Sequence, residues 1–196
     1  DGTQFYGFQR QGKVRTVQLE VEAALRKLDW QGRTILSAGR TDRGVHAAGQ
    51  VIAFDLDWRH PMDELQAALN AYLPSDMAVS AVETAKDDFH PRYRASARRY
   101  RYRIYCQPWR DPLRDRYAWR VWPPVQLERL QAIAGRLVGS RDFAAFGTPP
   151  RAGGSTVRTV HTSWWQCDGE DLIYEVVANA FLYHMVRRMV HLQAAV

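Results

Sequence analysis

Residues 97–106 read Ala-Arg-Arg-Tyr-Arg-Tyr-Arg-Ile-Tyr-Cys and alternate strictly between two kinds of side chain. Successive side chains of a β-strand point to opposite faces, so this period of two predicts a strand. One predicted face carries Tyr100, Tyr102, Ile104 and Cys106, and the other carries Arg99, Arg101, Arg103 and Tyr105. The strand is therefore expected to bury one face and to present a basic face.

The elements around this strand follow a recognisable order. After it we expect a helix at 127–138, a hairpin of strands 157–166 and 172–178 around Asp168-Gly169, and a last helix at 183–195. Before it we expect a helix at 17–29 capped by Thr16, strands at 34–38 and 50–56, a helix at 62–72 and a strand at 78–84. Each half is a βαββαβ unit with one outer strand missing.

This order predicts an α+β fold of two ferredoxin-like subdomains, residues 1–90 and 91–196, with mainly antiparallel sheets and a central cleft. The missing outer strands lead us to expect a fragment truncated at both ends. The length of 196 residues fits two small domains, and no apolar run is long enough for a membrane span.

The charge of the chain favours a polyanionic partner. The formal net charge is +6 and the isoelectric point is about 9.6, with three lysines and 24 arginines among the 27 basic residues. Ten arginines and seven tyrosines and tryptophans lie within residues 92–120, against Asp111 and Asp115. Guanidinium groups bind phosphates and aromatic rings stack on bases, so RNA binding is favoured over a solvated strand face.

The densest polar cluster is Gly39-Arg40-Thr41-Asp42-Arg43-Gly44-Val45-His46-Ala47, in the loop between two predicted strands. Glycines permit a sharp bend and a close approach of a ligand. Two flanking guanidiniums favour the ionised form of the Asp42 carboxylate, which suits a nucleophile or base. From composition alone, a turn with a structural Asp-Arg pair is the better interpretation.

The cluster resembles the GRTDxGVHA signature of the TruA family of pseudouridine synthases, and three further segments match in order. Residues 1–9 resemble the opening DGTxFxGxQ of that family. Residues 88–93 with 97–102 resemble its second block, and residues 179–187 resemble its third. The resemblance spans essentially the whole chain.

The resemblance implies a pseudouridine synthase fold and isomerisation of uridines 38–40 in the tRNA anticodon stem-loop, without cofactor or metal. It also implies a cytoplasmic homodimer. Asp42 matches the aspartate nucleophile of the family. The sequence does not distinguish attack on the ring, attack on the sugar and a glycal route.

The other site residues are also implied by the resemblance. Tyr100 matches the active-site tyrosine that stacks on the flipped base, and Arg187 matches the basic residue that pairs with the catalytic aspartate. Arg40 resembles the arginine that helps to extrude the base, with a phosphate contact as an open alternative. Phe181 is expected to wall the uracil pocket. Arg43 departs from the small residue usual at its position.

Other chemistries receive less support from the sequence. Cys106 and Cys167 form no CxxC pair and are expected to be buried free thiols, and His46, His90 and His184 lack the spacing of metal ligands. A glycosidase would need a second carboxylate near Asp42. A catalytically silent RNA-binding module is the remaining alternative, and the presence of Asp42 argues against it.

Overall fold

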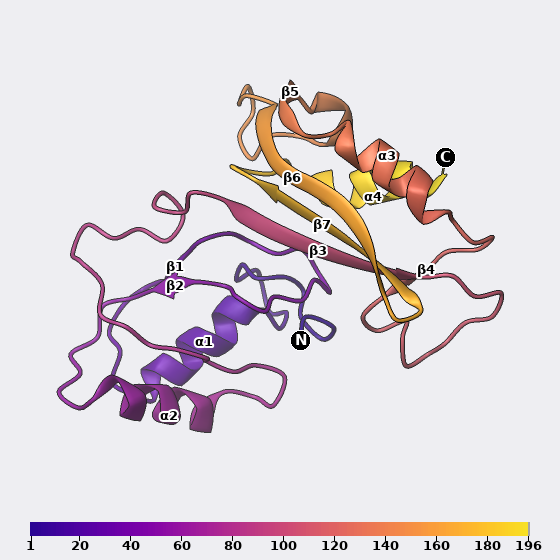
Figure 1. Cartoon of the computed structure of the whole chain (residues 1–196). Helices are drawn as coiled ribbons and strands as arrows, with labels where there is room; N and C mark the ends of the chain where they lie inside the picture. The colour runs from indigo at the N-terminus through magenta and orange to yellow at the C-terminus, as the bar shows by residue number, and fades with distance from the viewer. Residues whose placement is uncertain (196) are drawn as a thin grey trace. The chain divides into compact units, whose positions relative to one another are not determined.

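The computed structural model describes residues 1–195 of the chain. The chain divides into two compact units, Asp1–Ala95 and Ser96–Val196. Each unit has its own helices, its own sheet and its own apolar core (Figure 1). The mixture of helices and sheets agrees with the expected α+β class.

The first unit places two helices against a short hairpin of strands. Its elements are α1 (Val17–Arg26), β1 (Leu36–Ser37), β2 (Ile52–Ala53) and α2 (Met62–Tyr72). The strands β1 and β2 are antiparallel and are extended by a hydrogen bond from the Ala38 amide to the Val51 carbonyl, at 2.9 Å. Both strands are shorter than predicted. The whole Asp42 loop lies between them in the chain.

The helix α1 begins where the sequence predicts and ends earlier. The Thr16 hydroxyl accepts from the Leu19 amide at 3.4 Å, so the predicted cap is confirmed. Asp29 has a φ of 61°, which a right-handed helix does not allow. Val21 and Leu25 of α1 pack with Leu65 and Leu69 of α2 in the core of this unit.

The strand predicted at 78–84 does not form, and this prediction was wrong. The side chain of Asn70 both donates to the Val79 carbonyl, at 2.9 Å, and accepts from the Val79 amide, at 2.7 Å. Gln66 donates to the carbonyls of Val79 and Ser80. Side chains of α2 therefore satisfy backbone groups that a sheet would otherwise pair, while Val79 and Val82 still pack on the core.

The second unit is built on a five-stranded sheet. Its strands are β3 (Arg98–Tyr105), β4 (Trp119–Arg120), β5 (Gly139–Asp142), β6 (Val157–Asp168) and β7 (Asp171–Ala178). Its helices are α3 (Leu127–Gly135), the short 3₁₀ helix η1 (Ala144–Phe146) and α4 (Met185–Ala195). The predicted strand at 97–106 and the predicted hairpin are confirmed. The predicted helices at 127–138 and 183–195 form over shorter spans.

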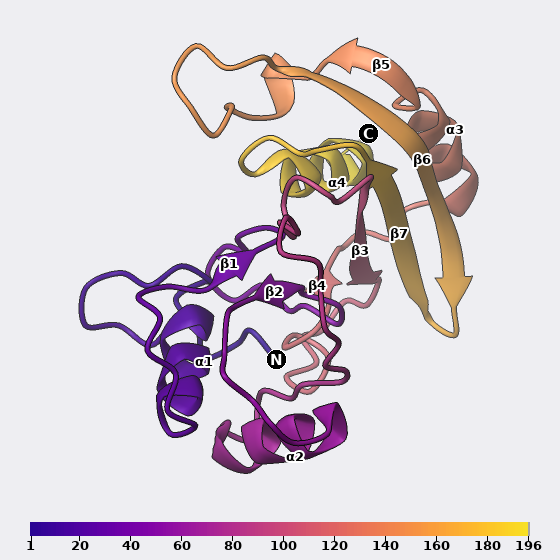
Figure 2. The same cartoon turned by 90° about the vertical axis from the view of Figure 1, so that its left-hand side faces the viewer.

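The strand order of this sheet is β4-β3-β7-β6-β5. β7 lies between β3 and β6 and is antiparallel to both, as Figure 2 shows. β3 and β6 are therefore parallel strands, separated by β7 and connected through α3. This is the split βαβ arrangement expected of a ferredoxin-like unit. β4 and β5 were not predicted, since one has two residues and the other, Gly-Ser-Arg-Asp, has no apolar alternation.

Both long helices of the second unit cover the same face of the sheet. Leu130 of α3 and Met189 of α4 pack in one core with Trp165, Tyr174 and Val176 of the sheet. Burying side chains of this size contributes about 1.5–3 kcal/mol each. The indole of Trp165 donates to the buried Gln193 of α4 at 2.9 Å, so its polar atom is also satisfied. The apolar face of β3 thus faces this core.

Candidate active site

Asp42 lies at a turn in the loop that connects β1 to β2. The Val45 amide donates to the Asp42 carbonyl at 3.2 Å, and Gly44 has a φ of 76°, which favours glycine. At the start of the loop, the Gln50 side chain donates to the Gly39 carbonyl at 2.9 Å. Asp42 is half-buried, whereas its neighbours Arg40 and Arg43 are exposed. The two predicted site residues of this unit therefore share one ordered loop.

The N-terminal segment, residues 1–8, holds this loop on both sides of Asp42. The Phe8 amide donates to the Thr41 carbonyl at 3.0 Å, and the Gly44 amide donates to the Phe5 carbonyl at 3.2 Å. The approach is close enough that a Cβ atom on Gly7 would lie 2.8 Å from the Thr41 oxygen. A Cβ on Gly2 would lie 2.1 Å from the Val45 oxygen. Two glycines of the opening motif are thus required by the position of the Asp42 loop.

His46 has a structural contact, as expected. Its Nδ1 accepts from the Gly2 amide at 3.0 Å, which joins the loop to the N-terminal segment once more. A ring nitrogen that accepts a backbone hydrogen bond is occupied in positioning the loop. We assign His46 no role in the reaction.

Tyr100 and Phe181 meet in the second unit. Their ring centroids are 4.8 Å apart and the rings are inclined by 76°, an edge-to-face contact. Tyr100 belongs to β3 and Phe181 follows β7, and both are half-buried against the core. Two residues that the sequence places 81 positions apart, at 100 and 181, are thereby brought together.

Arg187 is exposed on α4, and its charge affects a tyrosine of strand β3. Burial raises the pKa of Tyr102, and the positive charge of Arg187 opposes this rise in pKa. Tyr102 lies two residues after Tyr100 on the same face of β3. The guanidinium of Arg187 therefore lies near the face of β3 that carries Tyr100.

The basic face of β3 is largely engaged in ion pairs. Among the described residues, at least six of the ten arginines in 92–120 contact a carboxylate: Arg94, Arg99, Arg101, Arg103, Arg110 and Arg114. Glu175 of β7, which is buried, lies 3.7 Å from Arg99 and 3.2 Å from Arg101. Intramolecular contacts thus neutralise much of the positive charge that was predicted to bind RNA.

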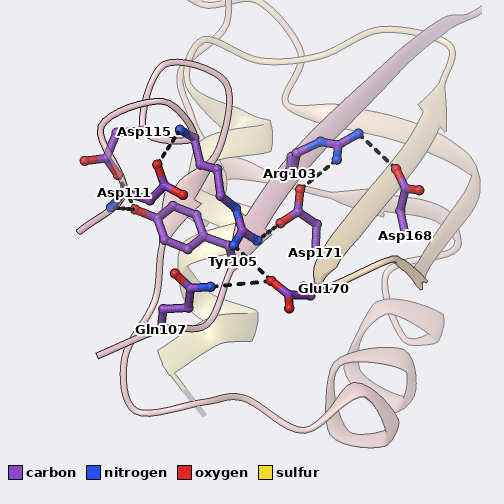
Figure 3. A network of polar contacts seen from close by, with 9 residues as sticks. Arg103, Tyr105, Gln107, Asp111, Asp115, Asp168, Glu170 and Asp171 are labelled. Atoms are coloured by element: carbon purple, nitrogen blue, oxygen red, sulfur yellow. Dashed lines mark hydrogen bonds and ion pairs between the residues drawn. The ribbon is translucent and has the colours of Figure 1, made fainter. Parts of the chain in front are cut away.

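A polar network at the end of β3 was not foreseen from the sequence. Figure 3 shows Arg103 between Asp168 and Asp171, to which it donates at 3.0 and 2.7 Å. Tyr105 lies on the basic face but is fully buried, and its hydroxyl donates to Asp115 and accepts from the Asp111 amide. The segment after β3 therefore folds back over the strand.

The cysteines differ in part from the prediction. Within residues 1–195 both are free thiols, but Cys106 is half-buried and Cys167 is exposed. Cys167 is exposed because it lies next to the hairpin turn at Asp168. No group of three His, Cys, Asp or Glu side chains in these residues is placed to hold a metal ion. Across the same residues, no helix has the length and apolar character needed to span a bilayer.

Comparison with known proteins identifies the family of this chain. The family model described as tRNA pseudouridine synthase matches residues 1–94 and 133–196. A protein of Halalkalibacterium halodurans named tRNA pseudouridine synthase A is 39% identical over 193 residues, covering 97% of this chain and 73% of that protein. A protein of the same name from Streptococcus equi subsp. equi is 40% identical, covering 97% of this chain and 78% of that protein.

The chain belongs to the tRNA pseudouridine synthase family. The resemblance drawn from the Gly39–Ala47 cluster is therefore confirmed, and so is the pseudouridine synthase fold. The matched segments include the Asp42 loop, Phe181 and Arg187, whereas Tyr100 lies between the two matched segments.

Proposed function

We propose that this chain isomerises uridine to pseudouridine in tRNA, with Asp42 as the nucleophile. The observation that carries the proposal is the Asp42 loop, which is held on both sides by backbone hydrogen bonds and carries exposed guanidiniums beside the carboxylate. Family membership supplies the substrate class. The targets are uridines 38–40 of the anticodon stem-loop, as the resemblance implies.

The reaction rearranges bonds within one nucleotide. The bond from N1 of uracil to C1′ of the ribose breaks, and a bond from C5 to C1′ forms. C5 then loses its proton and N1 gains one, so the product is an isomer of the substrate. No oxidant, reductant or energy source enters this balance. The protein must supply an ionised carboxylate, a binding site for the base and access to it.

The remaining site residues bind the substrate in this proposal. Tyr100 stacks on the uracil, and Phe181 walls the site beside it, a role that their edge-to-face contact supports. Arg40 fills the space that the base leaves or contacts a phosphate. Arg187 is the basic residue that pairs with the catalytic aspartate, as the resemblance implies. Taking the uridine out of its stack costs a few kcal/mol. One or two contacts between the tRNA and these side chains are of about that size.

The partner and the setting are parts of the same proposal. The positive net charge supports a polyanionic RNA as the partner. We propose a homodimer acting in the cytoplasm. Light scattering at working concentration tests the homodimer, and a scattering mass of one chain would contradict it.

The decisive experiment replaces the nucleophile. Asp42→Asn and Asp42→Ala are expected to abolish pseudouridine formation, as mapped by mass spectrometry of treated tRNA, with tRNA affinity nearly unchanged. Asp57→Asn is the matched control, since Asp57 is an exposed aspartate of the same unit. Pseudouridine formed by the Asn variant would refute the role of Asp42. If the unaltered chain binds tRNA and forms none, the silent module is the correct function.

A further inference from the structure

Two arginines face each other at the edge of the five-stranded sheet. Figure 2 shows β5 at this edge, beside β6. Arg141 of β5 is the direct antiparallel partner of Arg158 of β6. Residues that are directly opposite in such a pair project from the same face, with their Cβ atoms about 4.5–5.5 Å apart. Two positive charges at this spacing repel each other, so the pair destabilises the sheet edge unless an anion lies beside it.

Neither guanidinium forms an ion pair in the described part of the chain. Arg158 donates through Nη1 to the carbonyls of Ser155 and Val157, at 2.8 and 2.6 Å. Its Nε is buried and has no hydrogen-bond partner among the described residues. Arg141 is exposed and donates through Nε to the Val138 carbonyl at 3.4 Å. The contacts of both side chains are therefore with neutral backbone oxygens, and these do not cancel the two charges.

The carboxylate nearest to the pair in sequence does not compensate these charges. Asp142 directly follows Arg141, so its side chain projects from the opposite face of the strand. It also accepts from the first backbone amide of η1, at 2.9 Å. Burial lowers the pKa of Arg158, whereas a hydrogen bond to Asp171 raises the pKa of Arg103. Arg158 is thus a partly desolvated cation, and such a charge is costly without an anionic partner.

The pair lies at the end of the sheet that carries Tyr100. β7 ends near the starts of β3 and β6, because Ala178 pairs with Arg98 and with Val160. Val160 is buried in the core, so Arg158, two positions before it, projects from the same face of the sheet. Tyr100 packs against that core as well. A tRNA that places its uridine at Tyr100 would therefore reach the end of the sheet at which both arginines lie.

We propose that Arg141 and Arg158 together bind one backbone phosphate of the tRNA. A phosphate supplies the negative charge that the pair lacks, and its oxygens match the planar forks of two guanidinium groups. The inference rests on the proposed function, because it takes tRNA as the substrate. It extends the tRNA-binding surface from β3 to the edge strand β5.

The test measures the affinity of unmodified tRNA for the Asp42→Asn chain over a series of salt concentrations. Removing one phosphate contact lowers the magnitude of the slope of log affinity against log salt by about 0.7–0.9. We expect this change when Arg141→Ala and Arg158→Met are combined, with about ten-fold weaker binding at low salt, the size of one hydrogen bond to a charged group. Each change alone should weaken binding, and the two effects should not add, because the arginines share one phosphate.

Arg129→Ala is the matched control, because Arg129 is an exposed arginine of α3 in the same unit. It removes the same charge and should leave the slope unchanged. An unchanged slope in the combined variant would overturn the proposal. An equal loss of slope in the Arg129 variant would also overturn it, since the effect would then follow net charge and not this pair.

The stability of the Arg141→Ala variant separates binding from a structural role. Arg141 is exposed on the edge strand, so this variant is expected to fold and to provide the test by itself. Its thermal unfolding should be unchanged or shifted upward, because a like charge is removed. A large downward shift would overturn the proposal in favour of a structural role. Failure of the proposed function appears separately, as pseudouridine formed by the Asp42→Asn chain.

Discussion

The amide of Phe8 donates to the carbonyl of Thr41 at 3.0 Å, so the residue before Asp42 is fixed to a segment more than thirty positions earlier in the chain. The Gly44 amide completes the arrangement by donating to Phe5. The opening motif and the signature loop are thus parts of one structure. The geometry of the carboxylate depends on both.

Gly7→Ala is expected to disturb this arrangement. The new Cβ would lie 2.8 Å from the Thr41 oxygen, and the φ of 94° is strained for alanine. We expect a loss of stability of about 1–3 kcal/mol and a fall in turnover of at least ten-fold, because the loop must move. Thermal unfolding and pseudouridine formation measure the two effects.

Gly12→Ala is the control for backbone strain alone. Gly12 has a φ of 48°, and within residues 1–195 no atom lies within 4 Å of its would-be Cβ. We expect a smaller loss of stability and normal turnover. If both variants lose turnover equally, the close approach at Thr41 is not what positions Asp42.

The contact of Tyr100 with Phe181 is expected to be energetically coupled. In a double-mutant cycle of Tyr100→Leu and Phe181→Leu, the coupling in the free energy of unfolding should be about 0.5–1.5 kcal/mol, as for other edge-to-face pairs. Phe181→Leu alone should also lower kcat if the ring walls the uracil site. Unchanged kcat with the expected coupling would limit Phe181 to packing.

The pH dependence of stability should report the pair of Arg15 and Asp76. Arg15 donates to both carboxylate oxygens, at 2.7 and 2.9 Å, and these hydrogen bonds lower the pKa of Asp76 despite the opposing effect of burial. The stabilisation is therefore complete above the ordinary aspartate pKa of about 3.9 and is lost as the pH falls through the lowered pKa.

Asp76→Asn should accordingly lower stability at pH 7 by about 1–2 kcal/mol and flatten its decline between pH 5 and pH 2. Urea unfolding at a series of pH values measures both. Asp57→Asn removes an exposed carboxylate and should leave the curve unchanged. An Asp76 variant with the full acid decline would contradict the assigned cause.

The local sequence pattern predicted those elements whose tertiary surroundings favour the same structure as the pattern. The period of two in 97–106 gave a strand, and Asp168-Gly169 gave its hairpin turn, since both signals are local. The segment 78–84 has a similar apolar pattern but lies beside Asn70 and Gln66, whose side chains take its hydrogen bonds. The partners lie on helix α2, nine to fourteen residues earlier, and the pattern within 78–84 does not reveal them.

The same limit applies to the candidate site. The motif predicted Asp42 and Tyr100 as site residues, but the stack of Arg43 on Tyr6 and the hydrogen bonds around Thr41 depend on tertiary contacts. The arginines of 92–120 were counted as free charges. The carboxylate partners of Arg101 and Arg103, Glu175 and Asp171, come from strand β7, more than fifty residues later.

Glu175→Gln tests whether that basic face meets tRNA at all. The change releases Arg99 and Arg101 from their shared carboxylate, so a face that contacts phosphates should bind tRNA several-fold more tightly at low salt. Stability should fall by about 1–2 kcal/mol, because charge-assisted contacts are lost. Glu128→Gln is the control, since it removes the same charge from α3, which packs on the opposite face of the sheet. Equal affinity gains in the two variants would reflect net charge alone, and a gain confined to Glu175→Gln would place the tRNA on the basic face of β3.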